Sequence, residues 1–330
     1  MTIFDVARLA GVSHQTVSRV LNEHPNVRDT TRARVEEAVR QLHYRPNVAA
    51  RVMASRRSRN IGLITAGSTD YGPASTVLGF TSAARSARYA VTISTVVDIE
   101  PASLRASVDL LLGQQVEAIV VVASRVGVVS ALAGIEFDTP VIAVESTGLA
   151  PLPSVSIDQY AGARLVTEHL IGLGHRDIVH LAGPSDSLDA TERLRGWRDT
   201  MADHGLVAHP PWPGDWSPAS GYRLGRAGVA SGPAFTAIFS ANDQMALGCL
   251  HALREDGLQV PDQVSVVGFD DIPEAEHFCP PLTTMRQDFH QLGEDIMALV
   301  LTTLAADGSG PTTRHVPELI VRESSGPAPG

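Results

Sequence analysis

Apolar positions in the first 22 residues recur at helical intervals on both sides of Gly11. They are Val6, Leu9 and Ala10 before the glycine and Val17, Val20 and Leu21 after it. This pattern predicts two short helices joined by a tight turn, each with one apolar face to bury. Ser13 stands where its hydroxyl can cap the second helix.

A third helix is predicted for residues 30–43, where apolar side chains follow the i, i+3, i+4, i+7 spacing. Asp29 or Thr30 is placed to cap its start. The apolar positions are Val35, Ala38, Val39 and Leu42. Residues 1–45 are therefore interpreted as an all-α helix-turn-helix domain.

The outward face of the second predicted helix carries side chains that suit DNA bases. Glutamine can hold adenine through two hydrogen bonds, and arginine can do the same with the O6 and N7 atoms of guanine. In helix-turn-helix proteins the first turn of the second helix enters the major groove. The predicted DNA contacts of this module are Ser13, His14, Gln15, Thr16, Ser18, Arg19 and Asn22. The alternative is an ordinary solvated helix pair, which the presence of the third helix makes less favoured.

Charge separates the two ends of the chain. The first 60 residues contain 11 arginines and 5 acidic residues, a net charge of +6, although the formal net charge of all 330 residues is −10. The remaining 270 residues therefore carry −16. A basic module can bind the phosphate backbone of DNA while the acidic remainder is repelled by it. Double-stranded DNA is the expected partner.

Residues 46–59 join this module to the rest of the chain as a hinge helix and linker. Pro46 ends the third helix, and Asn47 can cap a further short helix that carries Met53 on its apolar side. A helix of about eight residues is marginal in water, so we expect it to order only when two copies pair. Asn47 and Met53 are interpreted as DNA contacts, with Met53 as a wedge in the minor groove. A flexible linker is the equal alternative.

From Ile61 onward, apolar strands alternate with amphipathic helical stretches. The strands read IGLIT, AVTISTVV, AIVVVAS, PVIAVES, DIVHLAG, FTAIFS and QVSVVGFD. This order is typical of an α/β fold built on parallel sheets. Residues 60–330 are long enough for two doubly wound halves with a ligand cleft at the carboxyl ends of their strands. No apolar run reaches the roughly 18 residues that span a bilayer and no signal peptide is recognised, so we expect a cytoplasmic protein without membrane contact.

An enzyme acting on a sugar or nucleotide is the rival interpretation, and the motifs give it little support. Gly172 and Gly174 imitate part of a dinucleotide fingerprint, but they end a predicted helix and the third glycine is missing. Asp270 and Asp271 are adjacent, whereas glycosidases place their carboxylates on both sides of the bond to be cleaved. The twelve histidines are scattered without metal-ligand spacing. We predict no catalytic residues, no metal and no cofactor.

Seven blocks of sequence stand in a fixed order along the chain. They read GVSHQTVSRVLN at 11–22, VTEHLIGLGHRDIVHLAGP at 166–184, ERLRGW at 192–197, GDWS at 214–217, ANDQMALG at 241–248, SVVGFDD at 265–271 and PLTTMRQDF at 281–289. Together they resemble the LacI/GalR family of repressors, nearly from end to end.

The resemblance implies a homodimer whose two N-terminal modules bind a near-palindromic operator. It also implies a body like a periplasmic sugar-binding protein, with one subdomain from 60–157 and 289–316 and another from 158–288 and 317–325. Three segments are then expected to cross between the subdomains. A sugar in the cleft is expected to act as inducer and release the operator. No leucine heptad follows near residue 330, so a dimer rather than a tetramer is expected.

Positions that match the family motifs assign the effector site. Arg193, Asn242 and Asp270 match polar groups that hold sugar hydroxyls, and Trp216 matches an aromatic that stacks on the ring. Vicinal hydroxyls suit guanidinium and carboxylate groups, and the apolar face of a pyranose suits indole. The remaining implied residues are Pro73, Glu145, Gln287 and Phe289, with Glu145 reaching into the cleft. A galactoside or related glycoside is expected, and a purine corepressor is the alternative because indole stacks on either.

Overall fold

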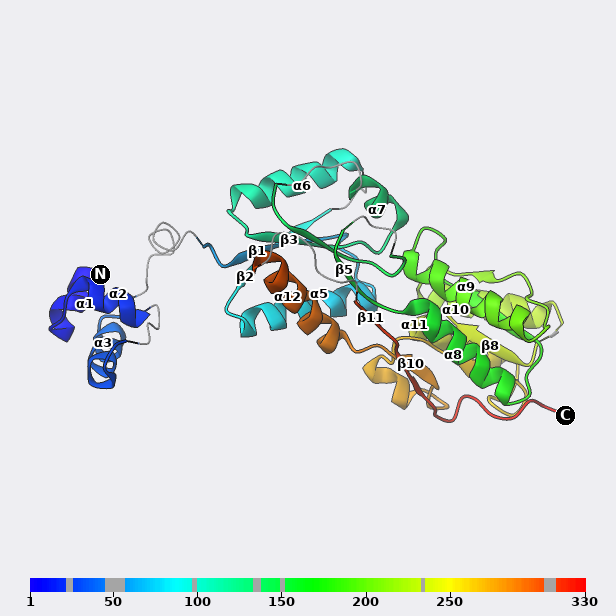
Figure 1. Cartoon of the computed structure of the whole chain (residues 1–330). Coiled ribbons are helices and arrows are strands. Elements are labelled where there is room, and N and C mark those ends of the chain that lie inside the picture. Colours follow the sequence, from blue (N-terminus) through cyan, green and yellow to red (C-terminus); the bar gives the residue numbers. More distant parts are fainter. Residues whose placement is uncertain are drawn as a thin grey trace. The chain divides into compact units, whose positions relative to one another are not determined.

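The computed structural model describes residues 1–21, 26–44, 57–96, 100–132, 138–148, 152–232, 235–305 and 313–330. The chain divides into two compact units, Met1–Ser58 and Arg59–Gly330 (Figure 1). Asn22 and residues 46–56 lie outside the described residues. The expected hinge helix and the roles of Asn22, Asn47 and Met53 therefore stay predictions.

The small unit is a bundle of three described helices, as the apolar spacing predicted. They are α1 (Ile3–Ala10), α2 (His14–Leu21) and α3 (Asp29–Gln41). Val6, Val17 and Val35, one from each helix, are fully buried where the helices meet. Because eight-residue helices are marginal alone, this shared core holds the unit together.

Two local expectations for the small unit are wrong. Leu9 is 50% exposed, because the buried stripe of α1 runs through Val6, Ala7 and Ala10 and leaves Leu9 beside it. The start of α3 has no side-chain cap: Asp29 is the first helical residue, and Arg28 occupies the cap position. The Asp29 carboxylate in the first turn still complements the positive end of the helix dipole.

The first half of the larger unit is a parallel sheet with helices on both faces. Within the described chain its strand order is β11–β5–β4–β3–β1–β2. The strands are β1 (Asn60–Thr65), β2 (Ala90–Thr95), β3 (Ala118–Val122), β4 (Val141–Val144), β5 (Ser154–Ile157) and β11 (Thr313–His315). Its helices α5 (Tyr71–Ser86) and α12 (Phe289–Ala305) cover one face, and α6 (Pro101–Gly113) and α7 (Val126–Leu132) the other (Figure 1). The apolar run of β3 is buried throughout, as expected for a strand covered on both sides.

The second half repeats this architecture with a smaller parallel sheet. Its described strands have the order β7–β6–β8–β9. They are β6 (Ile178–Ala182), β7 (Trp212–Pro213), β8 (Ala237–Ser240) and β9 (Ser265–Val267), with helices α8 (Gln159–Gly172), α9 (Leu188–Asp203), α10 (Pro218–Ala230) and α11 (Asp243–Glu255). A short antiparallel pair, β10 (Thr284–Arg286) with β12 (Glu318–Ile320), completes it. The predicted doubly wound α/β class is confirmed.

The described chain passes between the two halves three times. These crossing segments follow β5 at 157–159, β10 at 286–289 and β11 at 315–318. The amide of Asp158 donates a hydrogen bond to the carbonyl oxygen of His315 at 2.7 Å, which ties the first crossing to the third. The expected subdomain ends stay predictions. None of the helices in the described ranges is both long enough and apolar enough to span a bilayer.

His180 is expected to make the larger unit sensitive to acid. It is fully buried in β6, with Nδ1 3.0 Å from the Phe239 carbonyl oxygen and its ring stacked 5.5 Å from that of Trp197. Burial lowers the pKa of this imidazole to about 3. The folded state therefore keeps it neutral, whereas the unfolded chain takes up a proton below about pH 6.5. Stability is lost as the pH falls from about 6.5 toward 3, by up to about 1.4 kcal/mol per pH unit.

Urea unfolding between about pH 7.5 and about pH 5 tests this prediction. The wild type should lose about 2 kcal/mol more than His180→Phe over this interval. His204→Phe is the control, because it makes the same replacement at an exposed histidine just after α9. Equal slopes in all three proteins would contradict the role of the buried imidazole.

Candidate functional site

Helix α2 presents a polar face at the positions predicted to contact DNA. The hydroxyl of Ser13 accepts a hydrogen bond from the Thr16 amide at 3.2 Å, so Ser13 caps the helix as expected. The exposed or partly exposed side chains that follow are His14, Gln15, Thr16, Ser18 and Arg19. This face can therefore offer amide, hydroxyl and guanidinium groups to base edges.

Some arginines of the small unit serve its own structure. The guanidinium of Arg34 donates to the carbonyl oxygens of Ala10 and Gly11, at 3.2 Å for Gly11, and so closes the turn between α1 and α2. Arg40 pairs with Glu37 on its own helix at 2.5 Å. Such internal pairing reduces the positive charge available to phosphates and makes the remaining exposed arginines more important for DNA binding.

A cleft of about 520 Å³ opens in the larger unit, at the carboxyl ends of strands from both halves. Its walls are the loops that follow β1, β3, β6, β7, β8 and β9 and residues near the starts of α5 and α9. Parallel α/β sheets bind their ligands at this end. Five of the predicted effector residues line the cleft: Pro73, Arg193, Trp216, Asn242 and Asp270.

A small cavity of about 40 Å³ adjoins the cleft. The two share Gly72, Pro73, Ser124 and Asp189 in their walls. The other predicted effector residues line this cavity: Glu145, Gln287 and Phe289. The fold therefore brings all the predicted positions to one region, and their contact with a ligand stays a prediction.

Four buried side chains form a closed ring of three hydrogen bonds and one ion pair beside the cleft, here called the polar ring. Arg193 Nε donates to Gln159 Oε1 at 2.9 Å, and Gln159 Nε2 donates to Gln287 Oε1 at 2.8 Å. Gln287 Nε2 donates to Asp270 Oδ1 at 2.6 Å, and Arg193 Nη2 lies 3.4 Å from the same oxygen. Each of the four residues is at most 6% exposed. The ring satisfies polar groups that would be costly to bury alone.

Asp270 carries an unusual carboxyl group. Its pKa is raised to about 7: burial raises the pKa most, the positive charge of Arg193 opposes this effect, and the nearby carboxylate of Asp189 adds to it. Its backbone has φ of 118°, outside the usual range for a residue with a side chain. Near neutral pH this carboxyl can therefore accept or donate a hydrogen bond, as recognition of a hydroxyl requires.

Trp216 borders the cleft in a fixed position. Its backbone has φ of 72°, and its carbonyl oxygen accepts a hydrogen bond from Asn242 Nδ2 at 3.1 Å. A Cβ at Gly183 would lie 2.3 Å from Cη2 of the indole, so the absence of a side chain there makes room for the ring. The guanidinium carbon of Arg193 is 5.6 Å from the ring centroid.

Two predicted residues make other bonds than expected. Asn242 Oδ1 accepts from the Met245 amide at 2.9 Å and caps α11, so its amide group positions both that helix and Trp216. The expected reach of Glu145 into the cleft is wrong. Its carboxylate accepts hydrogen bonds from the amides of Thr147 and Gly148, each at 2.7 Å, because these donors lie in the turn directly after it.

Sequence reasoning missed Gln159 and the acidic lining of the cleft. Besides Asp270, the aspartates at the wall are Asp70, Asp186, Asp189 and Asp215, against the two arginines Arg125 and Arg193. Arg125 pairs with Asp186 at 3.0 Å. Each missed residue stands a few positions after the carboxyl end of a strand. That placement was the available signal.

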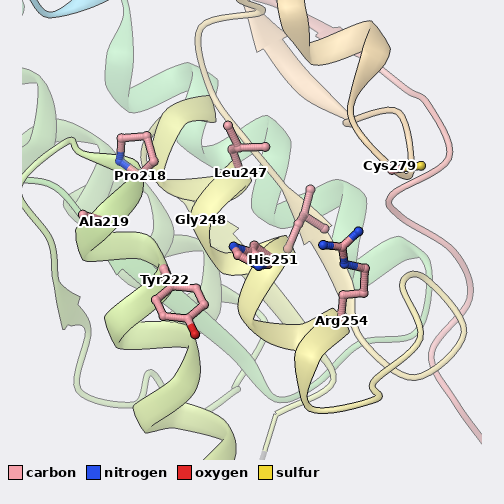
Figure 2. Close-up of a pocket in the computed structure, with 9 residues that line it drawn as sticks. Pro218, Ala219, Tyr222, Leu247, Gly248, His251, Arg254 and Cys279 are labelled. Carbon is pink, nitrogen blue, oxygen red and sulfur yellow. The ribbon is translucent and has the colours of Figure 1, made fainter.

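A separate groove of about 580 Å³ lies along α10 and α11. Figure 2 shows its wall, where Tyr222 and His251 lie side by side with ring centroids 5.0 Å apart. Leu247 and Cys279 also line it. None of the predicted effector residues does, and the groove lies on helix surfaces rather than at strand ends. The predicted effector residues therefore border the cleft and its adjoining cavity, and not this groove.

Comparison with known proteins identifies both units. Residues 2–47 match bacterial regulatory proteins of the lacI family, and residues 167–325 match the periplasmic binding protein-like domain. The lactose operon repressor of Escherichia coli (strain K12) is 36% identical over 299 residues, which cover 89% of this chain and 82% of that protein. The HTH-type transcriptional repressor PurR of Haemophilus influenzae (strain ATCC 51907 / DSM 11121 / KW20 / Rd) is 30% identical over 331 residues and 98% of each protein.

Solved structures agree over almost the whole chain. The Lac repressor dimer bound to operator and the anti-inducer ONPF has a TM-score of 0.87 and 33% identity, with 99% of each chain covered. The transcriptional regulator CelR in complex with cellobiose has a TM-score of 0.71 and 30% identity, with 98% of this chain and 99% of that chain covered. The chain therefore belongs to the lacI family of bacterial regulatory proteins, as a DNA-binding regulator.

Proposed function

We propose that the chain is a transcriptional repressor of the cytoplasm that binds a near-palindromic operator as a homodimer and is released by a galactoside or related glycoside. The observation that carries the effector assignment is the buried Arg193–Asp270 pair beside the Trp216 indole, in a cleft at the strand ends. In this proposal the protein is not an enzyme and needs no cofactor.

The chemistry of the cleft favours a sugar. Arg193 can donate to two neighbouring hydroxyls, Asp270 can accept from one, and the indole of Trp216 offers a flat apolar surface. Five aspartates against two arginines at the wall disfavour phosphorylated or otherwise anionic effectors. Among similar structures, one holds cellobiose and another, of the Lac repressor in its repressed state, holds ONPG.

A purine corepressor is the second candidate, because the PurR repressors are about as long as this chain and 29–32% identical to it. An indole stacks on a purine as well as on a pyranose. The two candidates predict opposite effects on DNA: the sugar weakens operator binding and the purine tightens it.

Calorimetry of the full chain with methyl β-galactoside, lactose and hypoxanthine separates the candidates. We expect the galactosides to bind and to lower the affinity for an operator selected from random palindromic duplexes. If hypoxanthine bound and the galactosides did not, and if hypoxanthine raised the affinity for the operator, the effector would be a purine and not a sugar. Failure to prefer any palindrome over random DNA at moderate salt would contradict the repressor assignment.

Release requires that the sugar bind two states of the larger unit unequally. A ligand shifts an equilibrium only by its difference in affinity for the two states, and about 1.4 kcal/mol of difference changes occupancy tenfold. We propose that the sugar-bound state separates the two expected hinge helices, so that Met53 leaves the minor groove and Asn47 loses its DNA contact.

Arg19→Ala tests the reading face of α2. Arg19 is exposed on the polar face of α2, so its guanidinium can reach a base. Its removal should cost about 1–3 kcal/mol of discrimination at one base pair of each half-site. Competition assays with every single-base variant of the operator measure this cost.

The matched control is Arg8→Ala, at an arginine of α1 whose side chain is 82% exposed. A lost phosphate contact at Arg8 would weaken binding to all sequences alike. If Arg19→Ala also weakened every operator variant equally, Arg19 would be a backbone contact and not a base-reading residue.

A further inference from the structure

The polar ring links the cleft to two of the segments that cross between the halves of the larger unit. Gln159 is the last residue of the crossing that leaves β5 and the first residue of α8. Gln287 lies between β10 and α12, in the crossing that returns to the first half. Arg193 and Asp270 belong to the second half and line the cleft. If Arg193 and Asp270 move, the side-chain amides of Gln159 and Gln287 that bond to them can therefore move two of the crossings.

We propose that Gln159 is a positioning residue that couples effector binding in the cleft to the orientation of the two halves, and so to operator release. The inference rests on the proposed function, because it assigns the regulation of that same cleft. Gln159 itself lines the small adjoining cavity and is not in the wall of the cleft, so it acts through Arg193 and Gln287.

Gln159 is tightly held at a point where all three crossings meet. It is 4% exposed, and both ends of its amide group are bonded to other members of the ring. The preceding residue, Asp158, donates its backbone amide to His315 at the end of β11. The first crossing is thus bound to the second through side chains and to the third through the backbone.

A ligand contact in the cleft can alter the polar ring, because neighbouring interactions in the ring use the same atoms. Asp270 Oδ1 accepts from Gln287 Nε2 and lies near Arg193 Nη2. A sugar hydroxyl that bonds to Arg193 or Asp270 competes for these same groups. Buried amides must then follow their moving partners or lose a hydrogen bond, which is costly where water cannot replace it. Sugar binding therefore changes the free-energy difference between the two orientations of the halves.

Two replacements at Gln159 distinguish the effects of its two side-chain hydrogen bonds. Gln159→Met keeps the length of the side chain and removes both hydrogen bonds. Gln159→Glu keeps an acceptor for Arg193 but removes the donor to Gln287. Gln291→Met is the matched control, since it makes the same replacement at an exposed glutamine of α12.

The measurement is the operator affinity of the full chain without sugar divided by that with saturating methyl β-galactoside. At saturation this coupling ratio does not depend on how tightly the sugar binds. We expect both Gln159 variants to lower the ratio toward one, by about tenfold, while Gln291→Met keeps it. Calorimetry confirms that each variant binds the sugar, and thermal melting confirms that it is folded. Should Gln159→Met not fold, Gln159→Glu decides alone.

Two results would overturn the inference without touching the proposed function. Folded, sugar-binding Gln159 variants with the wild-type ratio would remove any role of this residue. A loss in Gln159→Met but not in Gln159→Glu would show that the bond to Gln287, and with it the link to the second crossing, is unimportant. In contrast, a wild-type protein whose operator affinity does not respond to the galactoside would refute the proposed function, and the inference with it.

Discussion

Replacing Arg193 by alanine is expected to cost about 2–5 kcal/mol of galactoside affinity, which is roughly 30-fold to several thousand-fold in Kd. The guanidinium donates to Gln159 and to the Ala241 carbonyl oxygen, faces Asp270 and lies over the Phe269 ring at 3.9 Å from its centroid. Its removal takes away the donor to the sugar and leaves a buried carboxyl group without a cation. The pKa of Asp270 should then rise above 7, because burial stays and the opposing charge is gone.

Arg195→Ala is the matched control for this prediction. Arg195 is two residues further along α9, its side chain is half exposed, and it pairs with Glu192 at 2.5 Å outside the cleft. Calorimetry should show wild-type sugar affinity for Arg195→Ala. Operator binding by Arg193→Ala without sugar, together with its thermal melt, checks that the variant is folded. Release of Arg193→Ala from the operator at the usual galactoside concentration would show that the effector site is not this cleft.

The order of helices and strands was predictable because buried apolar residues recur at the spacing of the helix or strand that carries them. Strand β3 is buried on both faces and reads as an unbroken apolar run, and α2 shows its buried Val17 and Val20 at helical spacing. Leu9 shows the limit of this reasoning. The short helix α1 has apolar residues on more than one side, and only its packing against the other two helices decides which side is buried.

The candidate site was predictable in its location and only partly in its contacts. Strand ends and family motifs pointed to Arg193, Trp216 and Asp270, which the fold does bring together. Glu145 differs, because its hydrogen-bond donors are supplied by a turn whose shape one sequence does not reveal. Gln159 belongs to none of the motifs, and its two side-chain hydrogen-bond partners lie 34 and 128 positions away in the chain. Such bonds depend on how the crossings are placed in space, which local spacing does not encode.

Gly79→Ala is expected to destabilise the larger unit by about 3 kcal/mol, at the upper end for overpacking of a core. Helices α5 and α12 approach each other through Gly79 and Gly293. A Cβ at Gly79 would lie 2.1 Å from the Phe289 carbonyl oxygen, and one at Gly293 would lie 2.3 Å from the Gly79 carbonyl carbon. These neighbours are backbone atoms, so no side chain can turn away and one helix must shift. The melting temperature should fall by about 6–12 °C.

The control for this prediction is Gly113→Ala at the end of α6, where an added Cβ meets nothing within 4 Å. It should leave the melting temperature nearly unchanged. Gly79→Ala combined with Gly293→Ala should cost less than the sum of the two single changes, because the first already separates the helices. Since α12 starts at Phe289, beside Gln287, its shift also moves the second crossing. Additive losses in the double variant would mean that the two glycines tolerate side chains independently and that the close helix contact does not hold this half together.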